Sequence, residues 1–186
     1  KGIKITTGVQ IGGTELYNGK PVKDYFYSDI WDMRNIFPSV LVKSVQRYSI
    51  PINNRGVIFD YKLASEITKN TKKSAIVLEK YSSYLNEDKI LIRQSAPEIL
   101  ATFAKPGVCG EYSLFSLLNN SLFSDEFILA VLNSNVISFY AKRKGIILQK
   151  KGTQPQIRKN GLLMLPIAAP SVPTNDILVK LVSKII

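Results

Sequence analysis

Two apolar segments near the middle of the chain constrain its fold more than any other feature. Lys89–Arg93 reads KILIR, residues 99–104 read ILATFA, and Pro97 lies in the polar connection QSAPE between them. β-branched and aromatic residues favour a pleated, half-buried strand, whereas proline is confined to strand edges and connections. The pattern therefore predicts two neighbouring strands.

Further strands are expected on both sides of this pair. Residues 112–118, YSLFSLL, predict a third strand, and the dipeptide Asn18-Gly19 predicts a hairpin turn because it tolerates positive φ. Segment 40–50, VLVKSVQRYSI, predicts a strand, a short polar break and a second strand.

Helical periodicity appears in three places. Asp60 is an N-cap candidate for a helix over 61–69, and Ser74 for another over 75–86. Ser124 begins the clearest helix, which we expect to run unbroken to Gly145. Its apolar residues recur at spacings of one, three and four: Ile128, Val131, Leu132, Val136, Phe139 and Tyr140.

The order of these elements, without internal repeats, predicts an α+β fold with mixed or antiparallel sheets and a few packed helices. We expect residues 1–168 to form one domain, or two lobes with a boundary near 60–90. Residues 169–186 are expected to be a linker and the start of a truncated C-terminal helix, within a longer polypeptide.

Composition removes most catalytic chemistry. The chain has no histidine, which excludes Ser-His and Cys-His nucleophiles and His-based zinc sites, and its one cysteine, Cys109, is expected to be a small core or loop residue. No apolar run approaches the ~20 residues that span a bilayer. We therefore expect no membrane partner and a cytoplasmic location.

Two short motifs carry weak catalytic or cofactor signals. TTGVQIGG lacks the Lys-Ser/Thr of a P-loop and the spacing of a dinucleotide fold, so a β-turn is expected there. Glu87-x-Lys89 matches the end of the acid-x-Lys signature by which many nucleases bind magnesium, but a charged junction gives the same letters by chance. We assign no catalytic, cofactor-binding or metal-binding residue to this chain, and an independent nuclease remains a minor alternative.

The charge is large and unevenly placed. Lys and Arg total 25 against 14 Asp and Glu, a net charge of +11, which favours a polyanionic partner such as duplex DNA. Between Glu126 and Asp176 there is no acidic residue. The cationic strip in that interval consists of Lys142, Arg143, Lys144, Lys150, Lys151, Arg158 and Lys159.

Base-reading side chains accompany this strip. Glutamine can bind adenine bidentately and arginine can bind guanine, whereas lysines bind phosphate. Arg93, at the end of a predicted strand, either pairs with a carboxylate or faces a phosphate or base edge. The candidate DNA-binding residues are Lys43, Gln46, Arg47, Lys142, Arg143, Lys144, Lys150, Lys151, Gln154, Gln156 and Arg158.

Several segments together resemble a known family, the TaqI-like C-terminal specificity domain. They are KILIRQ at 89–94, LAVLNSNVISFY at 129–140, PQI at 155–157 and LPI at 165–167, with VLVKSVQRYSI upstream. The resemblance covers roughly residues 40–167. It is to the target recognition domain of adenine-N6 DNA methyltransferases and of fused type II restriction-modification enzymes.

The resemblance implies a non-catalytic DNA-specificity domain whose partners are double-stranded DNA and a catalytic methyltransferase domain in the same polypeptide. The N-P-P-Y/F and glycine-rich motifs of such catalytic domains are absent from this sequence. S-adenosylmethionine, with magnesium as a further candidate, is therefore expected to bind to the parent enzyme's other domains. Half of a type I specificity subunit and a basic protein-interaction module remain alternatives.

Overall fold

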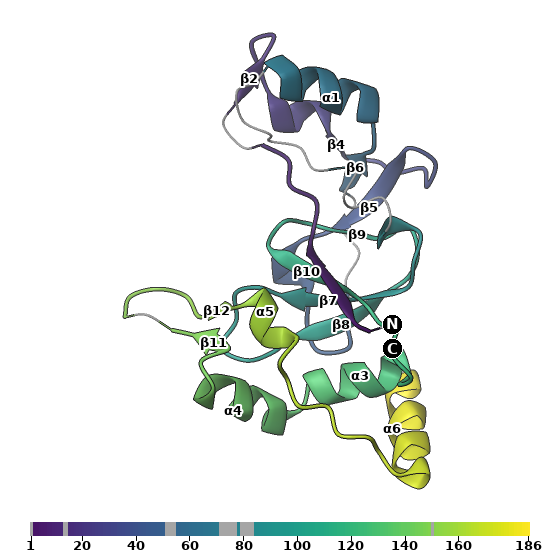
Figure 1. Ribbon diagram of the computed structural model, residues 1–186. Coiled ribbons are helices and arrows are strands. Elements are labelled where there is room, and N and C mark those ends of the chain that lie inside the picture. The colour runs from purple at the N-terminus through teal and green to yellow at the C-terminus, as the bar shows by residue number, and fades with distance from the viewer. Residues whose placement is uncertain (1, 13–14, 51–54, 71–77, 79–83, 150) are drawn as a thin grey trace.

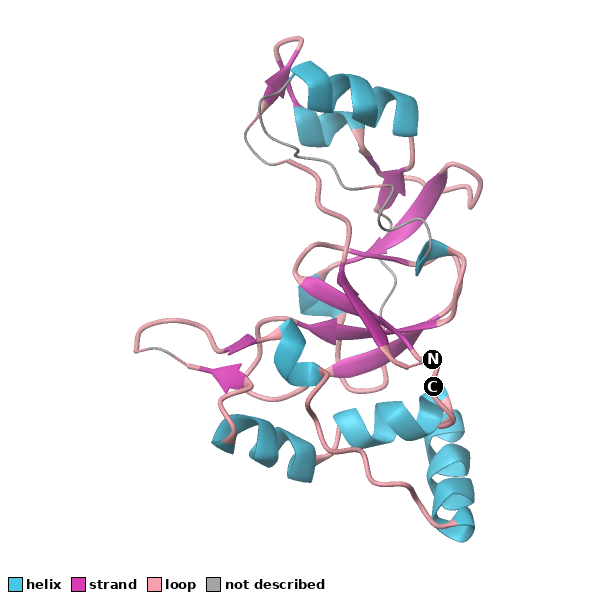
Figure 2. Cartoon of the chain, viewed as in Figure 1, coloured by secondary structure: helices cyan, strands magenta, loops and turns pink. Residues whose placement is uncertain are grey.

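The computed structural model describes residues 2–12, 15–50, 55–70, 78, 84–149 and 151–186. The predicted helix over 75–86 falls mostly outside these residues. The rest confirms an α+β fold in which one antiparallel sheet, one mixed sheet and several helices pack together (Figures 1 and 2).

The central sheet is antiparallel throughout and has the strand order β1-β10-β7-β8. Its strands are β1 (Lys4–Thr7), β7 (Lys89–Arg93), β8 (Ala101–Ala104) and β10 (Leu114–Leu118). The predicted neighbours β7 and β8 pair directly, and β10 is the predicted third strand, on the other side of β7. The apolar residues of β7 are fully buried, as their composition requires.

A second sheet has the order β4-β6-β5-β9, with only the β5–β9 pair parallel. It consists of β4 (Tyr27–Ser28), β5 (Ile36–Val40), β6 (Gly56–Ile58) and β9 (Cys109–Gly110). A small hairpin joins β2 (Leu16–Tyr17) to β3 (Lys20–Pro21), and Asn18 and Gly19 have the positive φ values expected of its turn. The short 3-10 helix η1 (Val22–Tyr25) follows.

The helices lie at both ends of the molecule (Figure 1). Helix α1 (Tyr61–Asn70) lies beside β2 and β4, and Asp60 Oδ1 accepts a hydrogen bond from the backbone N–H of Leu63, as predicted for an N-cap. Helices α3 (Asp125–Leu132), α4 (Asn135–Arg143) and α6 (Val172–Ile185) lie at the other end, next to the central sheet. No helix of the described residues has the length and apolar character needed to cross a membrane.

Helix α6 begins at Val172, four residues before Asp176, where the helix was expected to follow the linker APSVPTN. Pro173 lies in its first turn, where the missing N–H of proline has no intrahelical partner to lose. Leu178 and Val182 pack on the core that covers one face of the central sheet. The division of the chain at residue 168 stays a prediction.

The prediction of one unbroken helix from Ser124 to Gly145 is wrong. Ser124 does cap α3 and Gly145, at φ 66°, follows α4, but the chain turns between them at Asn133 and Ser134. Ser134 is extended, and its Oγ accepts a hydrogen bond from Ile137 N, which begins a second helix. The stripe is therefore broken, and Val136 and Phe139 are 75% and 61% exposed.

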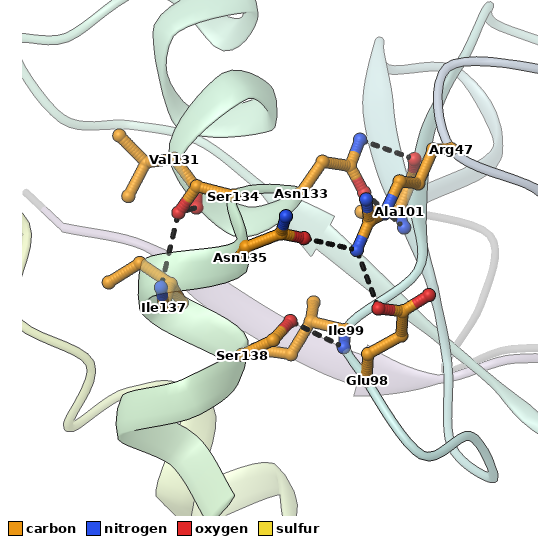
Figure 3. Close-up of polar contacts among 10 residues, drawn as sticks. All are labelled: Arg47, Glu98, Ile99, Ala101, Val131, Asn133, Ser134, Asn135, Ile137 and Ser138. Atoms are coloured by element: carbon orange, nitrogen blue, oxygen red, sulfur yellow. Dashed lines mark hydrogen bonds and ion pairs between the residues drawn. The ribbon is translucent and has the colours of Figure 1, made fainter.

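Asn133 explains the break (Figure 3). It is buried, its Nδ2 donates to Ala101 O at 2.9 Å, and its Oδ1 accepts from Ala101 N at 2.9 Å. A continuous helix would leave the polar groups of Ala101 without these partners, and unpaired buried groups are costly.

The second strand predicted within 40–50 is also wrong. After β5 the chain forms the 3-10 helix η2 (Val42–Ser44) and a tight turn in which Gln46 and Ser49 pair. Tyr48 has a φ of 63°, which is uncommon for a non-glycine residue, and its N–H donates to Ala101 O. Val45 and Ile50 instead pack against the core beside β7 and β10, which accounts for their apolar character.

We predict that Asn133→Ala lowers the free energy of unfolding by about 1–3 kcal/mol, because it leaves the buried N–H of Ala101 unpaired and removes one of the two hydrogen bonds to Ala101 O. Urea unfolding followed by circular dichroism measures the change. Asn135→Ala, at an exposed position two residues later, is the matched control and should cost less than about 1 kcal/mol. Equal losses for the two variants would contradict this account of the helix break.

Candidate nucleic-acid interface

The cationic strip starts at the C-terminal end of α4 and continues through a two-stranded ribbon. Lys142, Arg143 and Lys144 are exposed at that helix end. Arg143 lies over the ring of Phe139 and Lys144 over the ring of Tyr140, with cation-to-centroid distances of 5.4 and 5.9 Å. Phe139 is exposed and supports Arg143, whereas Tyr140 packs partly against the core, as its place on the apolar stripe predicted, and also contacts Lys144.

The ribbon pairs β11 (Ile147–Leu148) with β12 (Gln156–Ile157) and projects from the body of the molecule (Figure 1). Ile147 and Ile157 are buried, so the base of the ribbon is fixed to the core. In its connecting loop, Lys151 and Gln154 are exposed, whereas Lys150 lies outside the described residues. Arg158 is exposed immediately after the ribbon, at the start of α5 (Lys159–Leu162).

The cations of the strip have no carboxylate within ion-pair distance in the part of the chain that the structure describes. The ion pairs found there are Arg47–Glu98 and Arg55–Glu111, and neither involves the strip. Lys142, Arg143, Lys144, Lys151 and Arg158 are therefore exposed cations without a carboxylate partner among the described residues.

Gln156 differs from Gln154. Its Nε2 donates to Ser95 Oγ at 2.6 Å, and its backbone forms a bridge with Ser95. This contact ties the ribbon to the residues after β7, so the exposed side chain of Gln156 has a partner within the protein, and Gln154 is exposed in the loop.

Lys43, Gln46 and Arg47 lie apart from the ribbon, in the turn that follows β5. Lys43 and Gln46 are exposed. Arg47 is not free: its Nη2 lies 2.6 Å from Glu98 Oε2 and donates to Asn135 Oδ1 at 3.1 Å. Because Asn135 is the first residue of α4, the structure connects this turn to one end of α4 and the ribbon to the other.

The structure shows whether Arg93 pairs with a carboxylate of the protein, which is one of the two alternatives that the sequence left open. Its Nε is buried without a hydrogen-bond partner, and among the described residues no carboxylate lies within ion-pair distance. Arg93, at the end of β7, therefore has no carboxylate counter-ion among the described residues, and a contact with phosphate or a base edge stays a prediction.

A cavity of about 600 Å³ lies elsewhere and has the opposite electrostatic character. Asp88, Asp125 and Glu126 line it. Burial raises the pKa of Asp125, and the neighbouring carboxylates of Glu126 and Asp88 raise it further. These three carboxylates outnumber the one lysine of the lining, Lys105, and repel phosphate, so this cavity is not assigned to the candidate nucleic-acid interface.

The Glu87-x-Lys89 motif serves the fold. Lys89 is 1% exposed, and its Nζ donates to Leu85 O, Glu87 O and Lys105 O at 3.5, 2.9 and 3.3 Å. Burial lowers its pKa to about 8. The ammonium group thus joins two backbone segments, and no group of three or more His, Cys, Asp or Glu that could hold a metal occurs among the described residues.

The glycine-rich segment and Cys109 also have structural explanations. A Cβ at Gly8 would collide with the backbone oxygens of Gly110 and Glu111, so this glycine permits close approach of two backbones. Cys109 is fully buried, and burial raises the pKa of its thiol, which makes it an unreactive core residue as expected.

Residues 37–167 match the profile of the TaqI-like C-terminal specificity domain. The chain belongs to this family. The match confirms the resemblance carried by residues 40–167. No match to the chain was found among curated proteins.

A solved structure has the same fold. It is that of the type IIG restriction endonuclease BpuSI, with a TM-score of 0.57 and 12% sequence identity over 99% of this chain. This chain covers 25% of the chain of that enzyme, so the fold corresponds to one part of a larger protein there.

In this TaqI-like specificity domain, the residues that sequence analysis missed are those that connect its segments. Glu98, Asn133, Asn135 and Ser138 join the start of β8 to the corner between α3 and α4. The sequence signal that could have indicated this corner is LNS at 132–134, where an apolar helix is followed by two residues that favour caps and turns.

We predict that burial of Lys89 makes stability depend on pH between about 8 and about 10. The unfolded lysine, with a pKa near 10.4, keeps its proton where the folded one has lost it, so stability rises with pH in this window. Relative to Lys89→Met, wild type should gain up to about 1.4 kcal/mol per pH unit in its free energy of unfolding. Urea titrations at several pH values measure this. Lys62→Met, at an exposed site on α1, should give a flat difference, and a flat difference for Lys89→Met would refute the prediction.

Proposed function

We propose that this chain is the DNA-recognition domain of a restriction-modification enzyme and is not catalytic by itself. Its membership of a specificity-domain family gives the functional class. The observation that carries the proposal is the set of exposed cations from the end of α4 through the ribbon, which have no carboxylate partner in the described residues. Each phosphate that such a surface neutralises releases counterions and adds affinity.

The ribbon supports contact with a groove. The major groove of B-DNA admits a two-stranded β-ribbon, and Gln154 in the exposed loop has the bidentate amide that suits adenine. Lys151 in the same loop and the lysines at the end of α4 suit phosphates on either side. Arg158 is a candidate for guanine, and Lys150 for a further phosphate.

The length of α4 allows both candidate sets to bind one duplex. Its nine residues span about 13 Å, which is roughly four base pairs at 3.4 Å each. Lys43 and Gln46 lie in the turn tied to its N-terminal end, and the ribbon follows its C-terminal end. A single short recognition sequence can therefore meet both sets.

The parent enzyme, under this proposal, is an adenine-N6 DNA methyltransferase, with or without endonuclease activity. The catalytic domain in the same polypeptide would bind S-adenosylmethionine and act on an adenine flipped out of the duplex. The present domain would hold the duplex in register while that step occurs elsewhere.

We predict that Lys142→Gln/Lys144→Gln weakens binding to all duplexes and reduces the slope of log affinity against log salt by about 1–2 units. Fluorescence anisotropy with a mixed-sequence duplex at several salt concentrations measures both quantities. Lys62→Gln/Lys69→Gln, on exposed positions of α1, makes the same change in net charge. If that control lowers the slope equally, the affinity comes from total charge and not from the strip.

We also predict that Gln154→Ala reduces discrimination at one base pair by about 1–3 kcal/mol and leaves the salt slope unchanged. The probe is a duplex enriched by the wild-type chain from a library with a randomised centre, together with its single-base variants. Gln10→Ala changes an exposed glutamine that is distant from Gln154 in the sequence. This control should leave the preference for each base pair unchanged. Loss of affinity for every duplex alike would assign Gln154 to phosphate contact.

A further inference from the structure

Three segments distant in sequence meet at the start of β8 through side-chain hydrogen bonds (Figure 3). Arg47 Nη2 contacts both Glu98 and Asn135, which bridges the turn after β5, the connection before β8 and the first residue of α4. We call these three residues the Arg47 clasp. Beside it, Asn133 binds the backbone of Ala101, and Ser138 Oγ accepts from Ile99 N at 3.1 Å.

We propose that Arg47 is a positioning residue for DNA recognition and does not itself touch DNA. Through the Arg47 clasp it fixes the turn that carries Lys43 and Gln46 relative to α4. This inference rests on the proposed function, because it assigns a role within the same DNA-binding surface.

The surroundings of Arg47 support an internal role. Its side chain is 31% exposed, and its charge is paired with Glu98 at 2.6 Å. Its Nε is buried from solvent, so it could reach no ligand without rearrangement. A guanidinium held in this way offers an approaching phosphate little net charge. Lys43, four residues earlier, is exposed and differs in this respect.

The two ends of the clasp belong to different parts of the proposed interface. The turn also depends on the hydrogen bond from Tyr48 N to Ala101 O, and α4 depends on its cap at Ser134. Arg47 is the side chain that joins the turn directly to α4. Without it, the turn and the corner before α4 keep their hydrogen bonds to Ala101, but the direct tie between the turn and α4 is lost.

Contacts to bases and contacts to phosphates differ in how well they tolerate a small displacement of the turn relative to α4. Base contacts need partners within about 0.5 Å of their productive positions, whereas a flexible lysine follows a displaced phosphate. Loss of the clasp should therefore lower sequence discrimination more than overall affinity.

The test compares Glu98→Ala with Glu87→Ala in the full chain, because both remove one carboxylate and Glu87 is exposed and outside the clasp. The two probes are the duplex enriched by wild type from a randomised library and a mixed-sequence duplex. We expect Glu98→Ala to lower the ratio of the two affinities by about tenfold, while its affinity for the mixed duplex equals that of Glu87→Ala. The double variant Arg47→Glu/Glu98→Arg restores an ion pair with net charge unchanged, and should recover the ratio to within about threefold.

The opposite outcomes overturn the proposal. If Glu98→Ala tightens binding to both duplexes beyond Glu87→Ala with the ratio unchanged, then Glu98 restrains an arginine that binds DNA directly. If the charge-swapped variant is folded by circular dichroism but stays defective, Arg47 itself contacts DNA. An unchanged ratio in Glu98→Ala removes the positioning role altogether.

These failures differ from failure of the proposed function. A wild-type chain that enriches no sequence from the library lacks base recognition, and both proposals then fall. A wild-type chain that enriches a sequence while Glu98→Ala keeps full discrimination leaves the proposed function standing and refutes only the role of Arg47.

Discussion

The arrangement of the candidate interface depends on the backbone of Ala101 and the short segment before it. Ala101 begins β8 and exchanges two hydrogen bonds with the buried amide of Asn133, while its carbonyl also accepts from Tyr48 N. Inside a core such bonds are strong, and leaving their partners unpaired is costly. The same few atoms therefore determine where α4 begins and where the turn after β5 lies.

Sequence patterns correctly predicted those strands, caps and turns that depend on residues close together in the sequence. The strands β7, β8 and β10 follow from runs of apolar residues, and the caps at Asp60 and Ser124 follow from side chains that bind backbone groups of their own helix. The hairpin at Asn18-Gly19 follows from positive φ. Each of these features needs only residues within a few positions, so periodicity and turn chemistry are sufficient.

The predictions that were wrong concern elements whose conformation depends on residues distant in the sequence. The predicted helix ends early because the partner of Asn133 lies on β8, and the predicted second strand within 40–50 becomes a turn because Tyr48 also bonds to β8. The cationic strip was visible because its members are close in sequence. The engagement of Arg47 by Glu98 and of Gln156 by Ser95 was not, because neither partner can be identified without the fold.

The polar and charged side chains of the candidate interface are of two kinds: exposed cations, and side chains held by contacts within the protein. Lys151 in the ribbon loop and the cations at the end of α4 are exposed, and they suit a uniform phosphate backbone. Such contacts carry no sequence information by themselves, so a recognition domain also needs a rigid frame that holds its base-reading side chains in register. The ties from Gln156 to Ser95 and from Arg47 to Glu98 and Asn135 join the ribbon and the turn to the same central sheet and helix. Under the proposed function, Arg47 and Gln156 are therefore supports, and Gln154, Gln46 and Lys43 are the side chains that would act on the duplex.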